Sequence, residues 1–106
     1  MVLLDDRCTF DVLHGVEALG LCAAGRAAES VRHAVRTGPS GHGGQLAGGH
    51  AGGYGQLFEA VLQLRGDAGA RQIPNARVAV VSSSDPTGSA AAIVMGAERA
   101  EGGSVR

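Results

Sequence analysis

Histidine is the residue type in this chain best suited to proton transfer near neutral pH. The sequence holds four of them, His14, His33, His42 and His50. A neutral imidazole titrates near the working pH, so it can serve as an acid, a base or a donor to an oxyanion. His50 lies in a glycine-rich segment before a predicted helix, whose unpaired N–H groups favour negative charge. We therefore expect His50 to be the main catalytic candidate, and His14 and His33 to be structural.

Thiol chemistry centres on Cys8, the first of two cysteines. Cys8 follows Arg7, whose positive charge favours a thiolate, so Cys8 is a second, lesser catalytic candidate. Cys22 is expected to be a buried structural thiol. The cysteines form no CxxC pair, and residues 38–55 contain two histidines but no Asp, Glu or Cys. We therefore expect no metal site.

The segment from Gly38 to Gly55 contains nine glycines among eighteen residues. Such density favours positive φ angles or close approach of the backbone to a ligand. Neither G-x-G-x-x-G after a strand nor G-K-[ST] occurs here, which argues against a dinucleotide fold and a P-loop. The serines at positions 82–84 lack the G-x-S-x-G pattern of a nucleophile elbow.

Hydrophobic periodicity predicts the elements that must position these residues. Thr9 is the expected N-cap of the first helix, and Gly20 and Gly66 are expected to end helices. Asp85-Pro-Thr-Gly88 has the composition of a tight turn and predicts an antiparallel hairpin. The elements are a strand at 2–4, a helix at 9–21, a short helical turn within 23–37, a helix at 57–64, and largely buried strands at 77–83 and 90–95.

This order predicts an α/β domain with a mixed sheet and helices over residues 1–96. The first predicted strand is very short, so we expect the domain to be incomplete at its N-terminal edge. Residues 97–106 are small and polar and are expected to form a flexible tail.

Composition and charge exclude several classes of function. The chain has 106 residues, which suits one domain or part of one. A net charge of −1 supplies no field for nucleic acid or an anionic lipid surface. No apolar run is long enough to span a membrane, and the N-terminus does not resemble a secretory signal. We expect a cytoplasmic protein with reduced thiols.

A set of short strings occurs in order across about residues 3–95. They are Glu17-Ala-Leu-Gly-Leu-Cys22, Gly43-Gly44 with Gly49-His50 five residues later, Gln63-Leu-Arg-Gly66, Ala68-Gly69, Arg71-Gln72, Pro74 and Ala76-Arg-Val-Ala79. In this order and spacing the set resembles the C-terminal half of thiolases. It is most similar to the sterol-carrier-protein-type 3-ketoacyl-CoA thiolases and their lipid-transfer-protein relatives.

The resemblance implies the thiolase fold, in which two similar α/β halves enclose the active site and this chain is like the last part of the second half. In such enzymes a Cys of the first half takes an acyl group from a CoA thioester, and a Gly-His-Pro loop of the second half activates it. His50 matches that His. The resemblance also implies that Gly43, Gly44, Gly49 and Ser82 bind the acyl-CoA substrate, and that no cofactor is needed beyond this CoA thioester.

The chain departs from the family pattern at several positions. The family's Gly-His-Pro reads Gly49-His50-Ala51, its His-Asp-Cys-Phe string reads Asp5-Asp6-Arg7-Cys8, its His-Asn reads Ser82-Ser83 and its paired Gly reads Gly88-Ser89. In the sterol-carrier type, the Cys of the second string is an acid/base. Here Arg7 takes that position, and a one-residue slip would bring Cys8 into play.

Two interpretations follow. In the first, the chain is the C-terminal portion of an acyltransferase that cleaves 3-ketoacyl-CoA or condenses acyl groups. His50 is then the oxyanion donor or base, and a nucleophile-bearing N-terminal half, or a homodimer partner, completes the site. In the alternative, the chain is a non-catalytic thiolase-like partner subunit or a degenerate fragment. The isolated chain is expected to be inactive in both cases, because the nucleophilic Cys lies in the missing half.

Overall fold

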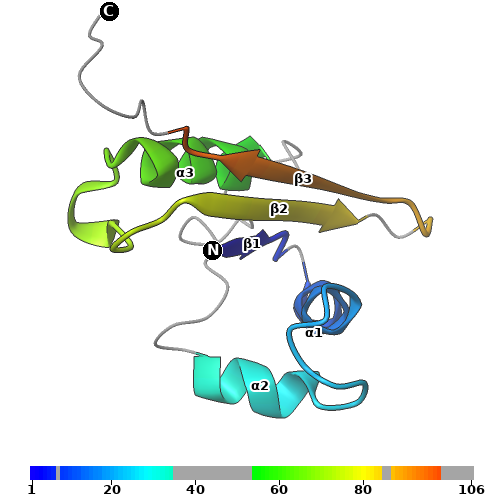
Figure 1. Ribbon diagram of the computed structural model, residues 1–106. Coiled ribbons are helices and arrows are strands. Elements are labelled where there is room, and N and C mark those ends of the chain that lie inside the picture. Colours follow the sequence, from blue (N-terminus) through cyan, green and yellow to red (C-terminus); the bar gives the residue numbers. More distant parts are fainter. Residues whose placement is uncertain (7, 35–53, 85–86, 99–106) are drawn as a thin grey trace, which may run out of the picture.

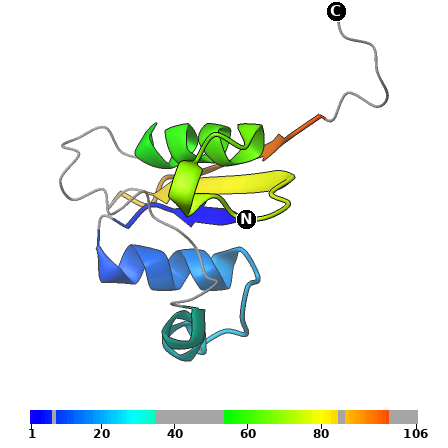
Figure 2. The same cartoon turned by 90° about the vertical axis from the view of Figure 1, so that its left-hand side faces the viewer.

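The structure is a computed structural model, and it describes residues 1–6, 8–34, 54–84 and 87–98. In these residues the strands form one small mixed sheet with helices on both faces, which confirms the α/β class (Figures 1 and 2). The elements are β1 (Val2–Leu4), α1 (Thr9–Ala18), α2 (Ala27–Ala34), α3 (Tyr54–Arg65), the 3₁₀ turn η1 (Gly69–Arg71), β2 (Val78–Ser84) and β3 (Ala90–Gly96). No helix of the described ranges is both long and apolar enough to cross a membrane.

Strand β2 lies between β1 and β3. β1 runs parallel to β2, with Leu4 opposite Ser82. Parallel neighbours need a long crossover, and the chain between β1 and β2 contains all three described helices. β3 runs antiparallel to β2, with Ser84 opposite Ala90, so the predicted hairpin is confirmed. Asp85 and Pro86 of its turn lie outside the described residues.

Alternating side chains of β1 connect two apolar clusters on opposite faces of the sheet. Leu3 belongs to the cluster under α3, and Leu4 to the cluster against α1 and α2. Figure 2 shows α3 on one side of the sheet and α1 and α2 on the other. The buried members are Leu3, Ala60, Ala79 and Val81 in the first cluster, and Leu4, Val16 and Ala27 in the second.

The first helix is shorter than the predicted range of 9–21 and ends at Ala18. Gly20 has a φ of +69°, so the predicted stop is confirmed just beyond the helix end. The prediction of Thr9 as N-cap is wrong, because Cys8 holds that position in extended conformation and no side chain caps the helix there. The helix therefore begins at Thr9, the first residue of the predicted range, and Thr9 is its first helical residue instead of its cap.

Helix α2 is a complete helix where only a short turn within 23–37 was predicted. Its start is held from α1, since Oε1 of Glu17 accepts hydrogen bonds from the backbone N–H groups of Gly25 at 3.0 Å and Ala27 at 3.3 Å. Such a cap comes from a residue far from the helix N-terminus in sequence, so local N-cap rules do not find it.

The prediction that the last two strands are largely buried is wrong for β3. Its Val94 side chain is 69% exposed, and in β2 only Ala79 and Val81 are buried. β3 is an edge strand of the described sheet, and the helices pack against β1 and β2. An apolar sequence therefore does not ensure burial where the described helices leave most of the strand exposed.

Helix α3 buries a stripe that is mostly polar, comprising Gln56, Glu59, Ala60 and Gln63. The spacing of these residues places them on one helix face. Phe58, one of the apolar residues that predicted this helix, is 58% exposed. Helix α3 extends beyond the predicted range of 57–64 at both ends, and Gly66 follows it with a φ of +82°.

Candidate active site at the carboxyl ends of β1 and β2

Parallel pairing brings the carboxyl ends of β1 and β2 to the same edge of the sheet. Asp5 follows β1 directly, and its backbone N–H donates to the carbonyl oxygen of Ser82 at 3.0 Å. In open α/β sheets, ligands bind beyond the carboxyl ends of parallel strands. This edge of the sheet is therefore the expected location of a binding or catalytic site.

Asp5 and Ser83 form a side-chain pair at this edge. The Ser83 hydroxyl donates to Oδ2 of Asp5 at 2.7 Å. Asp5 is only 6% exposed, so its carboxylate is largely removed from water. Burial of a carboxylate is costly unless hydrogen bonds compensate, and the hydroxyl of Ser83 supplies one.

The first turn of α3 meets the same edge through Gln56. Its Nε2 donates to the carbonyl oxygen of Leu4, the last residue of β1, at 3.2 Å. The side chain is fully buried, and its Oε1 has no hydrogen-bond partner among the residues that the structure describes. Gln56 thus ties the beginning of α3 to the end of β1.

An open groove of about 470 Å³ borders the pair. Helix α1 lines it with Asp11, His14 and Gly15, and the hairpin lines it with Ser82–Ser84 and Ala90–Ala92. Asp5 and Ser83 both contribute to its wall. The groove therefore combines small side chains with a few polar groups, as binding sites for small molecules do.

The structure places some of the predicted site residues and not others. His50, Gly43, Gly44 and Gly49 lie outside the described residues. Ser82 lines the groove, and its role in substrate binding stays a prediction.

Cys8 is exposed and does not line the groove. Cys22 is half-buried where burial was expected, and it packs against the Leu4 cluster, in keeping with the expected structural role. Both thiols are free. Within the described ranges, no group of three or more His, Cys, Asp or Glu residues could hold a metal ion.

Sequence reasoning missed Asp5, Ser83, Gln56 and the position of His14 in the groove wall. A signal existed for Asp5, because a carboxylate directly after a predicted strand marks a carboxyl end. Its pairing with Ser83 joins positions 78 apart. Only the register of the sheet reveals that contact.

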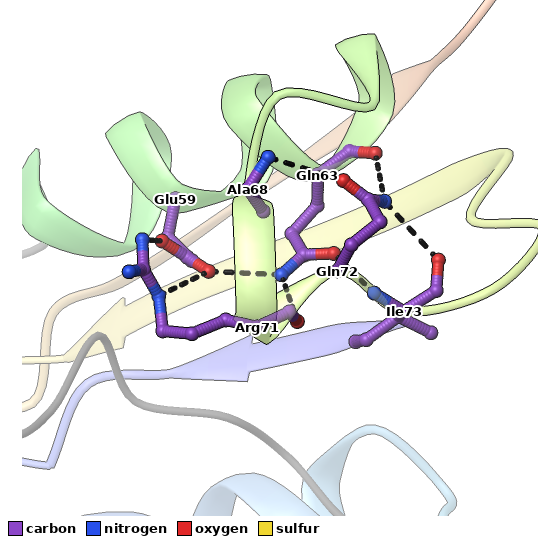
Figure 3. Close-up of polar contacts among 6 residues, drawn as sticks. All are labelled: Glu59, Gln63, Ala68, Arg71, Gln72 and Ile73. Atoms are coloured by element: carbon purple, nitrogen blue, oxygen red, sulfur yellow. Dashed lines mark hydrogen bonds and ion pairs between the residues drawn. The ribbon is translucent and has the colours of Figure 1, made fainter.

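A second polar cluster, the α3 clasp, consists of Glu59, Gln63, Arg71 and Gln72 (Figure 3). Arg71 Nη2 lies 2.9 Å from Oε2 of Glu59, which is 2% exposed. Gln63 donates to Oε1 of Glu59 at 2.9 Å and to the carbonyl oxygen of Arg71 at 2.8 Å. The clasp holds the connection through η1 against α3, and so sets where β2 begins.

The charge of Arg71 is reinforced by this arrangement. The hydrogen bond to Glu59, together with its negative charge, raises the pKa of Arg71 above the ordinary value for arginine. The guanidinium itself is largely exposed, whereas its partner is buried. The clasp is therefore a structural cluster at the buried face of α3, and its residues do not line the groove.

Comparison with known proteins shows the family to which the chain is related. Residues 1–97 match the family model described as thiolase C-terminal domain-like. Human sterol carrier protein 2 is 39% identical to the chain over 90 residues, which is 76% of this chain and 16% of that protein. The chain therefore spans less than a fifth of the length of this relative. No solved structure gives a significant match.

Proposed function

Since the chain belongs to the thiolase C-terminal domain-like family, we propose that it is the C-terminal portion of an acyltransferase that acts on CoA thioesters. The reaction is cleavage of a 3-ketoacyl-CoA or the reverse condensation. A nucleophile-bearing N-terminal half, supplied by another chain, completes the active site. The CoA thioester is a substrate, and the proposal includes no further cofactor.

The observation that carries the proposal is the meeting of three segments at one edge. The end of β1, the end of β2 and the first turn of α3 are joined there by the Asp5–Ser83 and Gln56–Leu4 hydrogen bonds. In sequence, His50 precedes Tyr54, the first residue of α3, by four positions. Four residues reach at most about 14 Å, so this linkage supports a role for His50 at the same edge.

The chemistry requires such a group. Acyl transfer builds negative charge on a carbonyl oxygen and consumes a thiolate, so a donor and a base must converge on the reacting carbon. We assign His50 the role of oxyanion donor or base, with Gly43, Gly44 and Gly49 as binding residues around it. Ser82 contributes a hydroxyl to the groove wall.

The groove suits the thioester end of the substrate better than its nucleotide end. Its described lining includes the carboxylates of Asp5 and Asp11 but no arginine. Carboxylates repel the phosphates of CoA, whereas an acyl thioester is neutral. We therefore place the acyl and thioester portion in the groove and the nucleotide portion outside it.

Exposed apolar side chains support the need for a partner. Phe58 on α3 and Ile93 and Val94 on β3 all lie at the surface. Exposed apolar side chains of this kind favour association with another polypeptide. The partner in the proposal is a thiolase N-terminal half or a homodimer partner, and two free thiols are consistent with a reducing, cytoplasmic setting.

The experiment is complementation. The full chain is co-expressed with the N-terminal half of a thiolase, and the purified complex is assayed for acyl-CoA release from 3-ketoacyl-CoA and CoA. His50→Ala is expected to lower kcat by about 100-fold or more. His42→Ala, which removes the other histidine of the same segment, is the matched control and is expected to retain activity. Equal rates for the wild-type and His50→Ala complexes would refute the role of His50.

The non-catalytic alternative has its own supporting observation. Cys8, the cysteine nearest the family's acid/base position, is exposed and away from the groove. A stable complex with no cleavage of 3-ketoacyl-CoA would favour a partner subunit over an enzyme. Size-exclusion chromatography of the co-expressed chains detects that complex independently of activity.

A further inference from the structure

We propose that Asp5, oriented by Ser83, is a proton-accepting catalytic residue of this site, in the role that Cys8 was expected to fill. The inference rests on the proposed acyl transfer and deepens it. It concerns the proton of the thiol that attacks the acyl group.

The position of Asp5 in the fold supports this role. Asp5 lies at the carboxyl end of β1 and in the wall of the groove, and Ser83 lies beside it on β2. Cys8 is in the same connection but is exposed and does not line the groove. Of the acidic and thiol groups described in the connection between β1 and α1, Asp5 is the one that lines the groove in which we place the thioester.

The direction of the hydrogen bond between Ser83 and Asp5 also supports this role. Ser83 donates its hydroxyl hydrogen to Asp5, so this hydrogen is engaged within the pair and the remaining lone pairs of both groups are acceptors. A pair of acceptors cannot stabilise an oxyanion, which needs donors. It can receive a proton from a thiol. The hydroxyl also holds the carboxylate in one orientation, which a base in a defined site requires.

The other described titratable groups near Asp5 are less suited to accept this proton. Asp11 and His14 line the groove from α1, and Asp6 is the next residue along the chain. On the buried face of α3 the titratable group is Glu59, which is engaged by Arg71 and Gln63. Asp5 alone among these carboxylates is both buried and part of the groove wall.

In the proposed step, proton transfer to Asp5 accompanies attack of the CoA thiol on the acyl group. The S–H bond of the incoming CoA thiol breaks, its proton goes to a carboxylate oxygen of Asp5, and its sulfur forms a C–S bond to the acyl carbonyl carbon. When the tetrahedral intermediate collapses, the C–S bond to the nucleophile of the partner half breaks. The leaving sulfur then takes the proton from Asp5, so the carboxylate is regenerated.

The test uses the same complex as the complementation assay. Asp5→Asn keeps the shape of the side chain and an acceptor for Ser83 but cannot take a proton. We expect kcat to fall about 100-fold or more with KM little changed, and the acidic limb of the kcat pH profile to differ from that of the wild type. Asp67→Asn, an exposed carboxylate beyond α3, is the matched control and is expected to keep the wild-type profile.

Two further variants test whether the effect of Asp5→Asn on kcat is purely structural. Asp5→Glu retains a carboxylate at a shifted position, and it is expected to retain part of the activity and the acidic limb. Ser83→Ala removes only the orienting hydrogen bond and is expected to lower kcat about 10-fold while that limb remains. Circular dichroism and the Tm report whether each variant folds.

The outcomes separate the two proposals. If the wild-type complex is active and His50→Ala is not, an Asp5→Asn complex with wild-type kcat and pH profile overturns the role of Asp5 alone. If Asp5→Asn does not fold, loss of the acidic limb in Asp5→Glu overturns it. A wild-type complex that forms but does not cleave substrate overturns the acyltransfer function, and the role of Asp5 with it.

Discussion

Gln56 and Gln63 lie on the same buried face of α3, yet only Gln63 has both amide atoms hydrogen-bonded. Nε2 of Gln63 donates twice, and its Oε1 accepts from the backbone N–H of Ile73 at 2.8 Å. Within the described ranges, Gln56 makes one side-chain hydrogen bond, to Leu4, and its buried Oε1 has no donor.

This difference predicts opposite responses to one substitution. Gln63→Leu removes three hydrogen bonds, a buried one to Glu59 and part-buried ones to Arg71 and Ile73, and is expected to lower the free energy of unfolding by about 2–4 kcal/mol. Gln56→Leu loses one bond but also removes an unsatisfied acceptor, so its effect is expected to stay within about 1 kcal/mol. Urea denaturation of the full chain measures both. A loss for Gln56→Leu as large as that for Gln63→Leu would contradict the assignment of its unpaired oxygen.

The ion pair of the α3 clasp predicts a second contrast. Arg71→Ala removes the cation from the buried carboxylate of Glu59 and is expected to lower the Tm clearly. Arg65→Ala, at the exposed end of α3, is the control and is expected to change the Tm little. Thermal unfolding followed by circular dichroism gives both values.

The clasp also predicts a pH dependence. Because Glu59 raises the pKa of Arg71, the folded chain holds this proton more tightly than the unfolded chain does. The stabilisation is therefore complete below the ordinary arginine pKa and is lost only as pH rises through the raised one. Between about pH 6 and 9 the Tm difference between wild type and Arg71→Ala is expected to stay constant, since arginine remains charged throughout. A difference that shrinks as pH rises across this range would show that another group controls the pair.

Gly66 predicts a backbone effect at the end of α3. Its φ of +82° is a conformation that residues with a Cβ adopt only at a cost. Gly66→Ala is expected to destabilise the chain by about 1–2 kcal/mol. In Gly96→Ala the new Cβ lies 3.9 Å from the carbonyl oxygen of Arg77, an ordinary contact, so that control is expected to be neutral or slightly stabilising. Equal losses of unfolding free energy in the two variants would refute the strained turn.

Two valines of the hairpin differ in burial, and this difference predicts different losses of stability on substitution. Val81 of β2 is buried under α3, whereas Val94 of β3 is exposed. Replacing a methyl by a hydroxyl at the buried position is expected to cost about 1–3 kcal/mol in Val81→Thr. Val94→Thr is expected to stay within about 0.5 kcal/mol. Chemical denaturation of the isolated chain distinguishes them, and a large loss at Val94 would mean that another layer covers β3.

The sequence by itself determined the family, the α/β class, the hairpin and the existence of the first helix and of the helix that follows the glycine-rich segment. These depend on local periodicity, turn residues and motif order, which a reader of the sequence can inspect directly. It also singled out Ser82, although without the groove that Ser82 lines. Gly20 and Gly66 marked helix ends because positive φ is a local requirement.

Only the tertiary structure decided which side chains are buried and which meet. The cap on α2 comes from Glu17, the polar stripe of α3 faces inward while Phe58 faces outward, and β3 lies uncovered. Asp5 and Ser83 are 78 positions apart and touch because β1 and β2 pair in one register. Burial and contact depend on the layer that packs over each segment, and no short stretch of sequence contains that layer.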